Sequence, residues 1–283
     1  MLRDYYALTK PGIIRANVLT AVAGYLFAAH RHIHPDLIAL IAGTTLVIAA
    51  GCVYNNYLDR GIDRQMKRTR NRALVAGRIR PLHALIYASA LGLAGFIILV
   101  ARTNALTVLL GAIALVFYVL VYGYAKRHTI HSTLIGAIPG AASLVAGYVC
   151  VTGHIDQAAL LLFAIMACWQ MPHFYAIGIY RRDEYASARL PIMTVKTPLR
   201  AAQMQIIMYQ LAFVVSSLLL ALDGYAGPLF GVVMAATSLA WLAYGIYGLR
   251  APDSTKWARA VFGWSLIVNL IFCTLLALNS WLS

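Results

Sequence analysis

Charged side chains are scarce in this sequence. Only 11% of its 283 residues are Asp, Glu, Lys or Arg, whereas 61% are hydrophobic, and the mean hydropathy is +0.75. Water-soluble domains contain about 25% charged and about 45–50% apolar residues. A water-soluble fold is therefore excluded. The four cysteines form no C-x-x-C pair and all lie in apolar stretches, which indicates buried packing thiols and no metal site.

Strand-like alternation of polar and apolar residues is also lacking, which argues against an outer-membrane barrel. Apolar windows of about 20 residues recur instead, each long enough to cross about 30 Å of hydrocarbon. We therefore predict an all-α, polytopic membrane protein with nine transmembrane helices. No low-complexity tract or long linker divides the chain, so residues 1–283 are expected to form one domain. The expected spans are 12–29, 37–57, 84–101, 104–123, 133–152, 158–180, 203–222, 226–248 and 259–281.

The formal charge of +14 could suggest a nucleic-acid partner, but the distribution of the charge does not. With the amino terminus in the cytoplasm, only Arg31 and Arg102 of the 23 Lys and Arg residues lie on the outer side. Such a bias follows the positive-inside rule and supports an odd number of spans. We therefore predict a cytoplasmic amino terminus, a periplasmic carboxyl terminus and no nucleic-acid partner.

Two of the inward loops, 58–83 and 181–202, are long, whereas all outward connections are short. These loops follow the second and the sixth spans, and each begins with acidic residues among arginines. The two loops are therefore four spans apart. This spacing predicts a weak internal repeat of four helices, about 12–123 and 133–248, followed by a ninth helix. Long polar loops between spans are where functional residues concentrate.

The first long loop opens with a regular row of polar residues. Asn55, Asp59 and Asp63 follow an i, i+4, i+8 pattern, so on a helix that continues from the second span they lie on one face, about 6 Å apart. Two carboxylates at this spacing repel each other unless something lies between them. Hard oxygen ligands along one face suit Mg²⁺, which commonly bridges carboxylates to substrate phosphates.

Basic residues crowd the same segment. One interpretation is a positive-inside anchor in which the two aspartates are intrahelical partners, but this leaves the regular spacing unexplained. The other is a diphosphate site, in which metal ions neutralise one side of the anion and forked guanidiniums bind its oxygens. The basic residues are Arg60, Arg64, Lys67, Arg68, Arg70, Arg72, Arg78 and Arg80.

The second long loop, "YRRDEYASARLP" from Tyr180 to Pro191, offers a second acidic position at Asp183 and Glu184. An ordinary charged loop is the alternative interpretation. A third inward piece, "YGYAKRH" from Tyr122 to His128, adds Lys126 and Arg127.

Four stretches carry a family resemblance: "TKPGIIRANVLTAVAGY", "NNYLDRGIDRQMKRTRNRALVAGRI", "KRHTIHSTLIGAIPGA" and "WQMPHFYAIGIYRRDEYASARLPIM". They resemble the UbiA-type intramembrane prenyltransferases, and within them the branch that farnesylates protohaem IX. The resemblance implies nine helices around a central cavity in a bacterial cytoplasmic (inner) membrane. It also implies Mg²⁺ as cofactor, and farnesyl diphosphate and protohaem IX as substrates.

The resemblance also assigns roles to residues. The second acidic motif departs from the family's Asp-x-x-x-Asp form because position 187 is Ser187, so the first motif is expected to hold most of the metal. The implied catalytic residues are Asn55, Asp59, Asp63 and Lys126. The implied diphosphate-binding residues are Arg68, Arg70, Arg72, Lys126, Arg127 and Arg182. The implied metal ligands are Asn55, Asp59, Asp63, Asp183 and Glu184.

His173, in "WQMPHFY", is the candidate residue for binding haem iron. It lies within the sixth span, where an ionisable side chain is usually functional, although a hydrogen-bonded structural histidine is the alternative. The neighbouring Pro172 is expected to interrupt the helix.

Two other functions stay open at this point. One is prenylation of an aromatic quinone precursor such as 4-hydroxybenzoate, within the same family. The other is a transporter, which is expected to carry charges in the middle of its spans, whereas here nearly all charges lie near the cytoplasmic ends. Besides the lipid bilayer, the candidate partners are a haem-modifying enzyme or a terminal oxidase.

Overall fold

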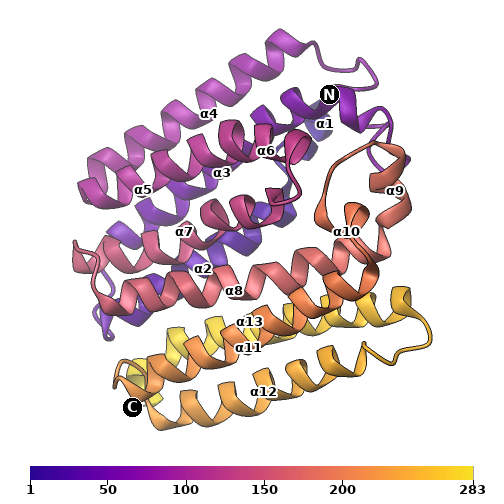
Figure 1. Cartoon of the computed structure of the whole chain (residues 1–283). Coiled ribbons are helices and arrows are strands. Elements are labelled where there is room, and N and C mark those ends of the chain that lie inside the picture. Colours follow the sequence, from indigo (N-terminus) through magenta and orange to yellow (C-terminus); the bar gives the residue numbers. More distant parts are fainter. Residues whose placement is uncertain (283) are drawn as a thin grey trace.

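The protein is built from helices that run roughly side by side across one slab-shaped molecule (Figure 1). The computed structural model describes residues 1–282, and this part of the chain contains no strand. It contains nine helices that are long and apolar enough to cross a membrane. The predicted all-α, nine-span fold is therefore confirmed. The single domain and the four-helix repeat stay predictions.

The first half of the chain contains a short helix at the amino terminus and four spans. The fourth span is one continuous run, Ala105–His128, that includes a π-helical turn. The elements are α1 (Leu2–Leu8), α2 (Pro11–Ala29), α3 (Asp36–Asp63), α4 (Pro81–Arg102), α5 (Ala105–Val116), η1 (Phe117–Val121) and α6 (Tyr122–His128).

The second half contains five spans and two short helices within the second long loop. These short helices, α9 and α10, lie at one end of the molecule, next to the carboxyl end of α8 (Figure 1). The elements are α7 (Ser132–Thr152), α8 (Gln157–Tyr180), α9 (Arg182–Ser187), α10 (Met193–Lys196), α11 (Leu199–Leu222), α12 (Pro228–Tyr247) and α13 (Ser254–Leu282).

The helix α3 extends beyond its predicted span of 37–57 to Asp63, which confirms that the acidic row continues the helix. The residues added to it are polar, and they remain helical because their side chains contact other elements. Thr69 Oγ1 donates a hydrogen bond to the Asp63 carbonyl oxygen at 2.9 Å, which orders the turns that follow α3.

The expected interruption at Pro172 is wrong, because α8 is continuous from Gln157 to Tyr180 with Pro172 inside it. Proline removes one hydrogen bond from a helix, but neighbouring helices in a membrane protein can hold the weakened turn in place. Here α8 packs against α7, α11 and α13, and Pro172 is buried among them. Pro139 is accommodated inside α7 in the same way.

The first and last spans meet, because α13 packs against both α2 and α8. The helix α2 also packs against α7, and α7 packs against α8. The largest group of buried hydrophobic side chains comes from these four helices together with α11 and α12. The helices that carry the central core therefore come from both ends of the chain.

The contact between α2 and α7 depends on two glycines. A Cβ atom on Gly24 would lie 2.1 Å from the Leu144 carbonyl oxygen, and one on Gly147 would lie 1.8 Å from the Ala21 carbonyl oxygen. Both distances are below any real contact, so the two backbones touch only because side chains are missing at these positions. Small residues commonly permit such close approach between membrane helices.

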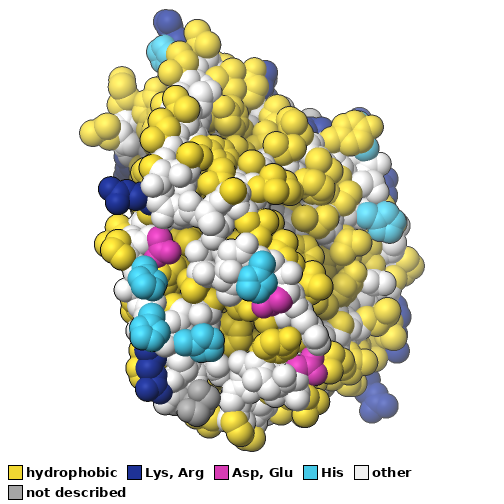
Figure 2. All heavy atoms as spheres, turned by 90° about the vertical axis from the view of Figure 1, so that its left-hand side faces the viewer, with side chains coloured by type: hydrophobic (Ala, Val, Ile, Leu, Met, Phe, Trp, Pro, Cys, Tyr) yellow, Lys and Arg dark blue, Asp and Glu magenta, His cyan; other side chains and the backbone are white. Residues whose placement is uncertain are grey.

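One end of the molecule carries nearly all of the basic residues. We call it the polar end and define it by the connections 64–80, 129–131, 181–198 and 248–253. Figure 2 shows the opposite end, where histidines and acidic side chains lie across the face and Lys and Arg appear mainly at its margins. Asp36 begins α3 there, and Asp156 and Asp223 lie in short connections. The basic residues there are Arg31 and, at the end of α4, Arg102.

The close approach of α2 and α7 yields a stability prediction. We expect Gly147→Ala to lower the free energy of unfolding by about 1–3 kcal/mol, because the added methyl group forces the two backbones apart. The measurement is the melting temperature of the purified protein in one detergent. The control is Gly263→Ala within α13, where an added Cβ has no heavy atom within 4 Å. An equal melting temperature for Gly147→Ala and wild type would contradict the close packing.

Candidate active site

The site lies where α3 reaches the polar end, and three polar side chains are buried there. Asn55 is 3% exposed, Asp59 is 4% exposed and Asp63 is 2% exposed. Their spacing of four residues places them along one side of the helix, as the sequence predicts. Burying carboxylates is costly unless charged partners or hydrogen bonds compensate, so the neighbours of these groups decide what the site does.

Asp59 is bound by two cations from the end of the fourth span. Lys126 Nζ forms an ion pair with Asp59 Oδ2, and Arg127 Nη2 donates a hydrogen bond to Asp59 Oδ1 at 3.0 Å. Arg127 also donates to the carbonyl oxygens of Leu58 and Gly123. The π-helical turn η1 directly precedes this segment, and such turns often occur at functional sites because they shift the direction of the side chains that follow.

Asp63 is bound by Arg72, which reaches back from the first long loop. Arg72 Nη1 donates to Asp63 Oδ2 at 2.6 Å and to Asn56 Oδ1 at 3.0 Å. Asn56 Nδ2 in turn donates to the Leu8 carbonyl oxygen at 2.7 Å, so the network extends to α1. The loop is thus held against the acidic face of α3.

Lys10 is a member of the site that sequence reasoning missed. Its Nζ donates a hydrogen bond to Asn55 Oδ1 at 2.6 Å, across the gap between α2 and α3. Lys10 has φ of +52° in the break between α1 and α2, a left-handed conformation that costs free energy for a residue with a side chain. The only signal in the sequence is a lone lysine before Pro11 at the start of the first span.

Burial, assisted by the positive charges of Arg72 and Lys126, lowers the pKa of Lys10 to about 8. Together the two carboxylates face four cations: Lys10, Arg72, Lys126 and Arg127. Two positive charges are therefore in excess, by the arithmetic of four minus two. An excess of partly buried positive charge is an arrangement that favours binding of an anion.

The two long loops meet through Glu184. The backbone N–H of Arg68 donates to Glu184 Oε1 at 3.1 Å, and Arg181 Nη1 donates to Glu184 Oε2 at 3.1 Å. The side chains of Met66, Ala188 and Leu190 form a small buried cluster between the same loops. Glu184 therefore ties the second loop to the first loop close to the acidic face of α3.

Three predicted residues lie outside this network. Arg70 and Asp183 are exposed and make no side-chain hydrogen bond or ion pair with residues 1–282. Arg182 Nη2 points to the carbonyl oxygens of Val195 and Thr197, each at 3.4 Å. The structure thus brings together Asn55, Asp59, Asp63, Arg72, Lys126 and Arg127, with Arg68 and Glu184 at the edge. The roles of all these residues stay predictions.

His173 lies deeper in the molecule, on the side of α8 that faces α13. Its Nδ1 is 2.8 Å from Ser265 Oγ, and its ring stacks on Trp169 with centroids 5.0 Å apart. The ring of Phe262 lies 4.7 Å away on the other element. His173 is half-buried.

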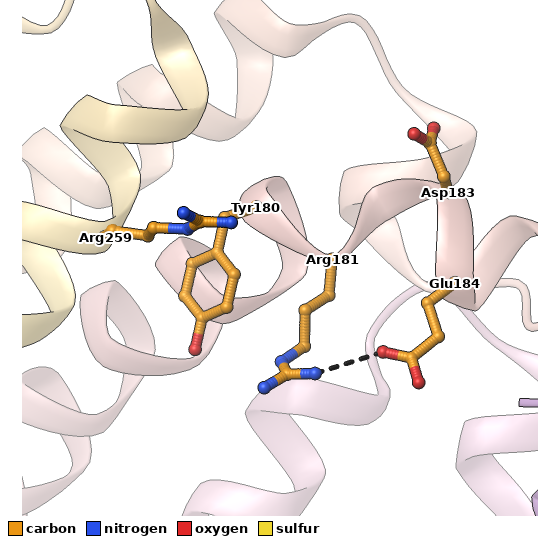
Figure 3. Close-up of a pocket in the computed structure, with 5 residues that line it drawn as sticks. All are labelled: Tyr180, Arg181, Asp183, Glu184 and Arg259. Atoms are coloured by element: carbon orange, nitrogen blue, oxygen red, sulfur yellow. Dashed lines mark hydrogen bonds and ion pairs between the residues drawn. The ribbon is translucent and has the colours of Figure 1, made fainter. Parts of the chain in front are cut away.

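A pocket of about 430 Å³ opens at the polar end between α8, α9 and α13 (Figure 3). Arg181 and Arg259 both lie beside the ring of Tyr180, while Glu184 turns toward Arg181 and Asp183 points away from that pair. Sequence reasoning treated Arg259 only as part of the positive-inside bias. Its proximity to Tyr180 depends on the packing of α13 against α8, which no local pattern predicts.

Residues 17–267 match the UbiA prenyltransferase family. The chain is 46% identical to the protoheme IX farnesyltransferases of Citrobacter koseri and of Escherichia coli K12, over 94% of this chain and 91% of each of theirs.

Solved structures of low sequence identity share the fold. A structure of digeranylgeranylglyceryl phosphate synthase in membranes aligns with a TM-score of 0.83 at 17% identity, covering 99% of this chain and 98% of that one. A UbiA homolog from Archaeoglobus fulgidus, bound to GPP and Mg²⁺, aligns with a TM-score of 0.73 at 15% identity, covering 96% and 99%.

The environment of Lys10 yields a prediction about pH. An unfolded chain binds a proton at lysine up to about pH 10.4, whereas the folded protein releases it from Lys10 near pH 8. Between these values the unfolded state binds more protons, so folding stability should rise with pH in this window and be lowest below pH 8. We expect the wild type to show this rise and Lys10→Met to lack it, in melting temperatures measured from pH 7 to pH 10.

Lys67→Met, in which an exposed lysine of the first long loop is removed, is the matched control and should keep the wild-type pH profile. If Lys10→Met and the wild type gain stability in parallel across this window, Lys10 is not held in the unfavourable environment that its burial implies.

Proposed function

The chain belongs to the UbiA prenyltransferase family, and we propose that it transfers the farnesyl group of farnesyl diphosphate to a vinyl group of protohaem IX, giving haem O and diphosphate. The observation that carries this proposal is the 46% identity to protoheme IX farnesyltransferases over 94% of the chain. The buried row of Asn55, Asp59 and Asp63, with its excess of cations, supplies a matching diphosphate site.

The residues at the end of α3 fit a hard divalent metal. They offer carboxylate and amide oxygens, which are the ligands that Mg²⁺ prefers. The amide nitrogen of Asn55 is buried with no hydrogen-bond partner among residues 1–282, and as an N–H donor it suits a phosphate oxygen of the substrate and not the metal. We propose that Asn55, Asp59 and Asp63 hold Mg²⁺, with Glu184 and Asp183 as a second position. No three side chains of His, Cys, Asp or Glu form a cluster within residues 1–282, so the amide and the substrate phosphates complete the site.

Bound Mg²⁺ supplies positive charge that stabilises the departing diphosphate. The basic residues act on the same anion. Lys126, Arg127 and Arg72 are already fixed in place by Asp59 and Asp63, so they need little reorganisation when a diphosphate arrives. Lys10 lies on the other side of Asn55 and adds a fourth donor. Arg68 lies at the rim, 43% exposed, where it can reach an entering headgroup.

The reaction needs no nucleophilic side chain. As the allylic C1–O bond of farnesyl diphosphate breaks, C1 gains positive charge and the electron pair leaves with the diphosphate oxygen. The vinyl group of protohaem donates its π electrons to C1, and the new carbon–carbon bond leaves a cation next to the porphyrin. Water adds to that cation and loses a proton, which leaves a hydroxyethylfarnesyl group. The protein contributes charge stabilisation and orientation.

The distribution of basic residues supports a topology. The nine spanning helices and the relatives indicate a multi-pass membrane protein. We propose that it lies in the bacterial cytoplasmic membrane with its polar end and amino terminus in the cytoplasm, since cytoplasmic segments of membrane proteins are rich in Lys and Arg. The carboxyl terminus then lies in the periplasm. A haem-modifying enzyme or a terminal oxidase is the proposed consumer of the product.

A direct assay tests the proposed activity. The purified protein is supplied with farnesyl diphosphate and Mg²⁺, and protohaem and 4-hydroxybenzoate are offered in parallel. We expect a product only from protohaem, heavier by one farnesyl group and one hydroxyl group, detected by mass spectrometry. Product from 4-hydroxybenzoate alone would assign the chain to the quinone branch. Movement of a solute across liposomes without release of diphosphate would favour a transporter.

The carboxylates of α3 are expected to be essential to catalysis. Asp59→Asn and Asp63→Asn each keep the size of the side chain but remove the charge that holds metal and cations, and each should lower kcat by at least about 10²-fold. Asparagine is chosen because alanine at Asp59 would also leave Lys126 buried without its partner. Near-normal kcat in either variant would argue against the site.

The matched control is Asp253→Asn, which removes an exposed carboxylate at the polar end before α13. Its kcat should stay close to that of the wild type. Melting temperatures of all three variants separate a loss of folding from a loss of chemistry.

A further inference from the structure

The structure fixes the tautomer of His173. Ser265 Oγ lies 2.6 Å from the Phe262 carbonyl oxygen, which can only accept, so the single hydroxyl proton of Ser265 is donated there. Ser265 Oγ therefore accepts a hydrogen bond from His173 Nδ1 at 2.8 Å. In a neutral imidazole, the proton on Nδ1 leaves the lone pair of Nε2 free. This is the arrangement in which a histidine commonly binds a metal through Nε2.

The aromatic neighbours hold the ring in one orientation. Trp169 stacks on His173, and its own Nε1 donates to the Ser265 carbonyl oxygen at 2.7 Å. Phe262 contacts the ring from α13, and within residues 1–282 no partner for His173 Nε2 is present. The Nε2 of this half-buried imidazole could bind an iron atom, and the aromatic side chains around it could pack against a flat apolar macrocycle that carries the iron.

The pocket at Tyr180 lies two helical turns away on the same face. Tyr180 follows His173 by seven residues on α8, a rise of about 10 Å, and Arg259 precedes Ser265 by six residues on α13, about 9 Å. The two helices run in opposite directions, and Phe262 contacts both the His173 ring and the Tyr180 ring. His173 and the pocket are therefore two ends of one α8–α13 face.

The pocket presents guanidinium groups that can bind an anion. The Cζ atoms of Arg181 and Arg259 lie 5.4 Å and 5.8 Å from the Tyr180 ring centroid. Arg181 is bound to Glu184, whereas Arg259 forms no ion pair with any of residues 1–282. An unpaired guanidinium fork beside a cavity of about 430 Å³ matches a carboxylate, which it can bind with two parallel hydrogen bonds.

Protohaem carries both features on one molecule: an iron at the centre of an apolar ring and two carboxylates on one edge. In a membrane protein the carboxylates must reach a polar region, because burying them in hydrocarbon is very costly. We propose, on the basis of the function proposed above, that protohaem binds along the α8–α13 face. Its iron is bound by His173 Nε2, and its carboxylates are bound by Arg259, assisted by Arg181, at Tyr180.

The diphosphate is a poorer occupant of this pocket. The cations around Asp59 and Asp63 come from the break before α2, the first long loop and α6, and none of them lines the pocket. Glu184 faces into the pocket, and its carboxylate repels a polyanion more strongly than it repels a single carboxylate.

A binding experiment with the full-length protein tests the carboxylate subsite. Protohaem and its dimethyl ester, in which both carboxylates are blocked, are titrated into the wild type and Arg259→Gln in the same lipid nanodiscs. We expect the wild type to prefer the free acid by about ten- to a hundredfold, and Arg259→Gln to lose that preference. The control is Arg250→Gln, which removes an exposed arginine from the same end of the molecule and should keep the preference.

Two further readouts sharpen the result. In turnover, Arg259→Gln should raise the KM for protohaem and leave the KM for farnesyl diphosphate unchanged. Inorganic pyrophosphate should not displace protohaem from the wild type. The subsite would be overturned if Arg259→Gln and the wild type preferred the acid over the ester equally. It would also be overturned if Arg259→Gln changed the KM for farnesyl diphosphate and not that for protohaem, or if pyrophosphate displaced protohaem.

The iron ligand is tested by absorption spectra of bound protohaem. At saturating protohaem, His173→Ala should change the position of the Soret band, and Ser265→Ala should change it by a smaller amount. Ser265→Thr keeps the hydroxyl group and should show the wild-type Soret band. Identical spectra in all variants would overturn the assignment. Because these measurements record binding alone, they separate this subsite from the activity: a protein that binds protohaem as described but forms no haem O would contradict only the proposed function.

Discussion

The balance of buried charge at the end of α3 is the constraint on which the rest of the site depends. Two carboxylates in an apolar protein have to be compensated, and four cations surround them. Asp59 pairs with two of these cations and Asp63 with one, and Lys10 bonds to the neighbouring Asn55, which is more positive charge than neutrality requires. The surplus is repulsive in the ligand-free protein and becomes favourable only when an anion enters. The protein thus carries an electrostatic cost that the proposed diphosphate would relieve, as expected of a site shaped for its ligand and not for stability.

The same balance explains how distant segments assemble. Asp59 draws in the end of the fourth span through Lys126 and Arg127, and Asp63 holds the first long loop through Arg72. Glu184 then connects that loop to the second one. The links of Asp59 to the fourth span and of Glu184 to the first loop join segments that are far apart in the chain, so ion pairs and hydrogen bonds hold the polar end where the apolar packing of the spans stops. Loss of one carboxylate therefore affects several loops together.

The sequence predicted the elements whose signals are local. The nine apolar windows and the i, i+4, i+8 row of Asn55, Asp59 and Asp63 are such signals, and the structure contains them as spans and as a buried helical face. Lys10 and Arg259 gave no such signal, because each becomes part of a site only through packing between distant helices. The expected break at Pro172 was wrong for the related reason that burial among α7, α11 and α13 outweighs one missing hydrogen bond.

Two anionic groups have to be accommodated at one polar end without competing for the same cations. The surplus charge around α3 suits a polyanion, whereas the single unpaired fork of Arg259 suits a carboxylate. Glu184 stands between them, bound to Arg181 on one side and to Arg68 on the other. Asn55 lies eight residues inside the end of α3, and His173 lies seven residues inside the end of α8, so both are about 10–12 Å from those ends. The two proposed sites therefore lie at similar depths below the polar end, on two helices, α3 and α8, that both pack against α7.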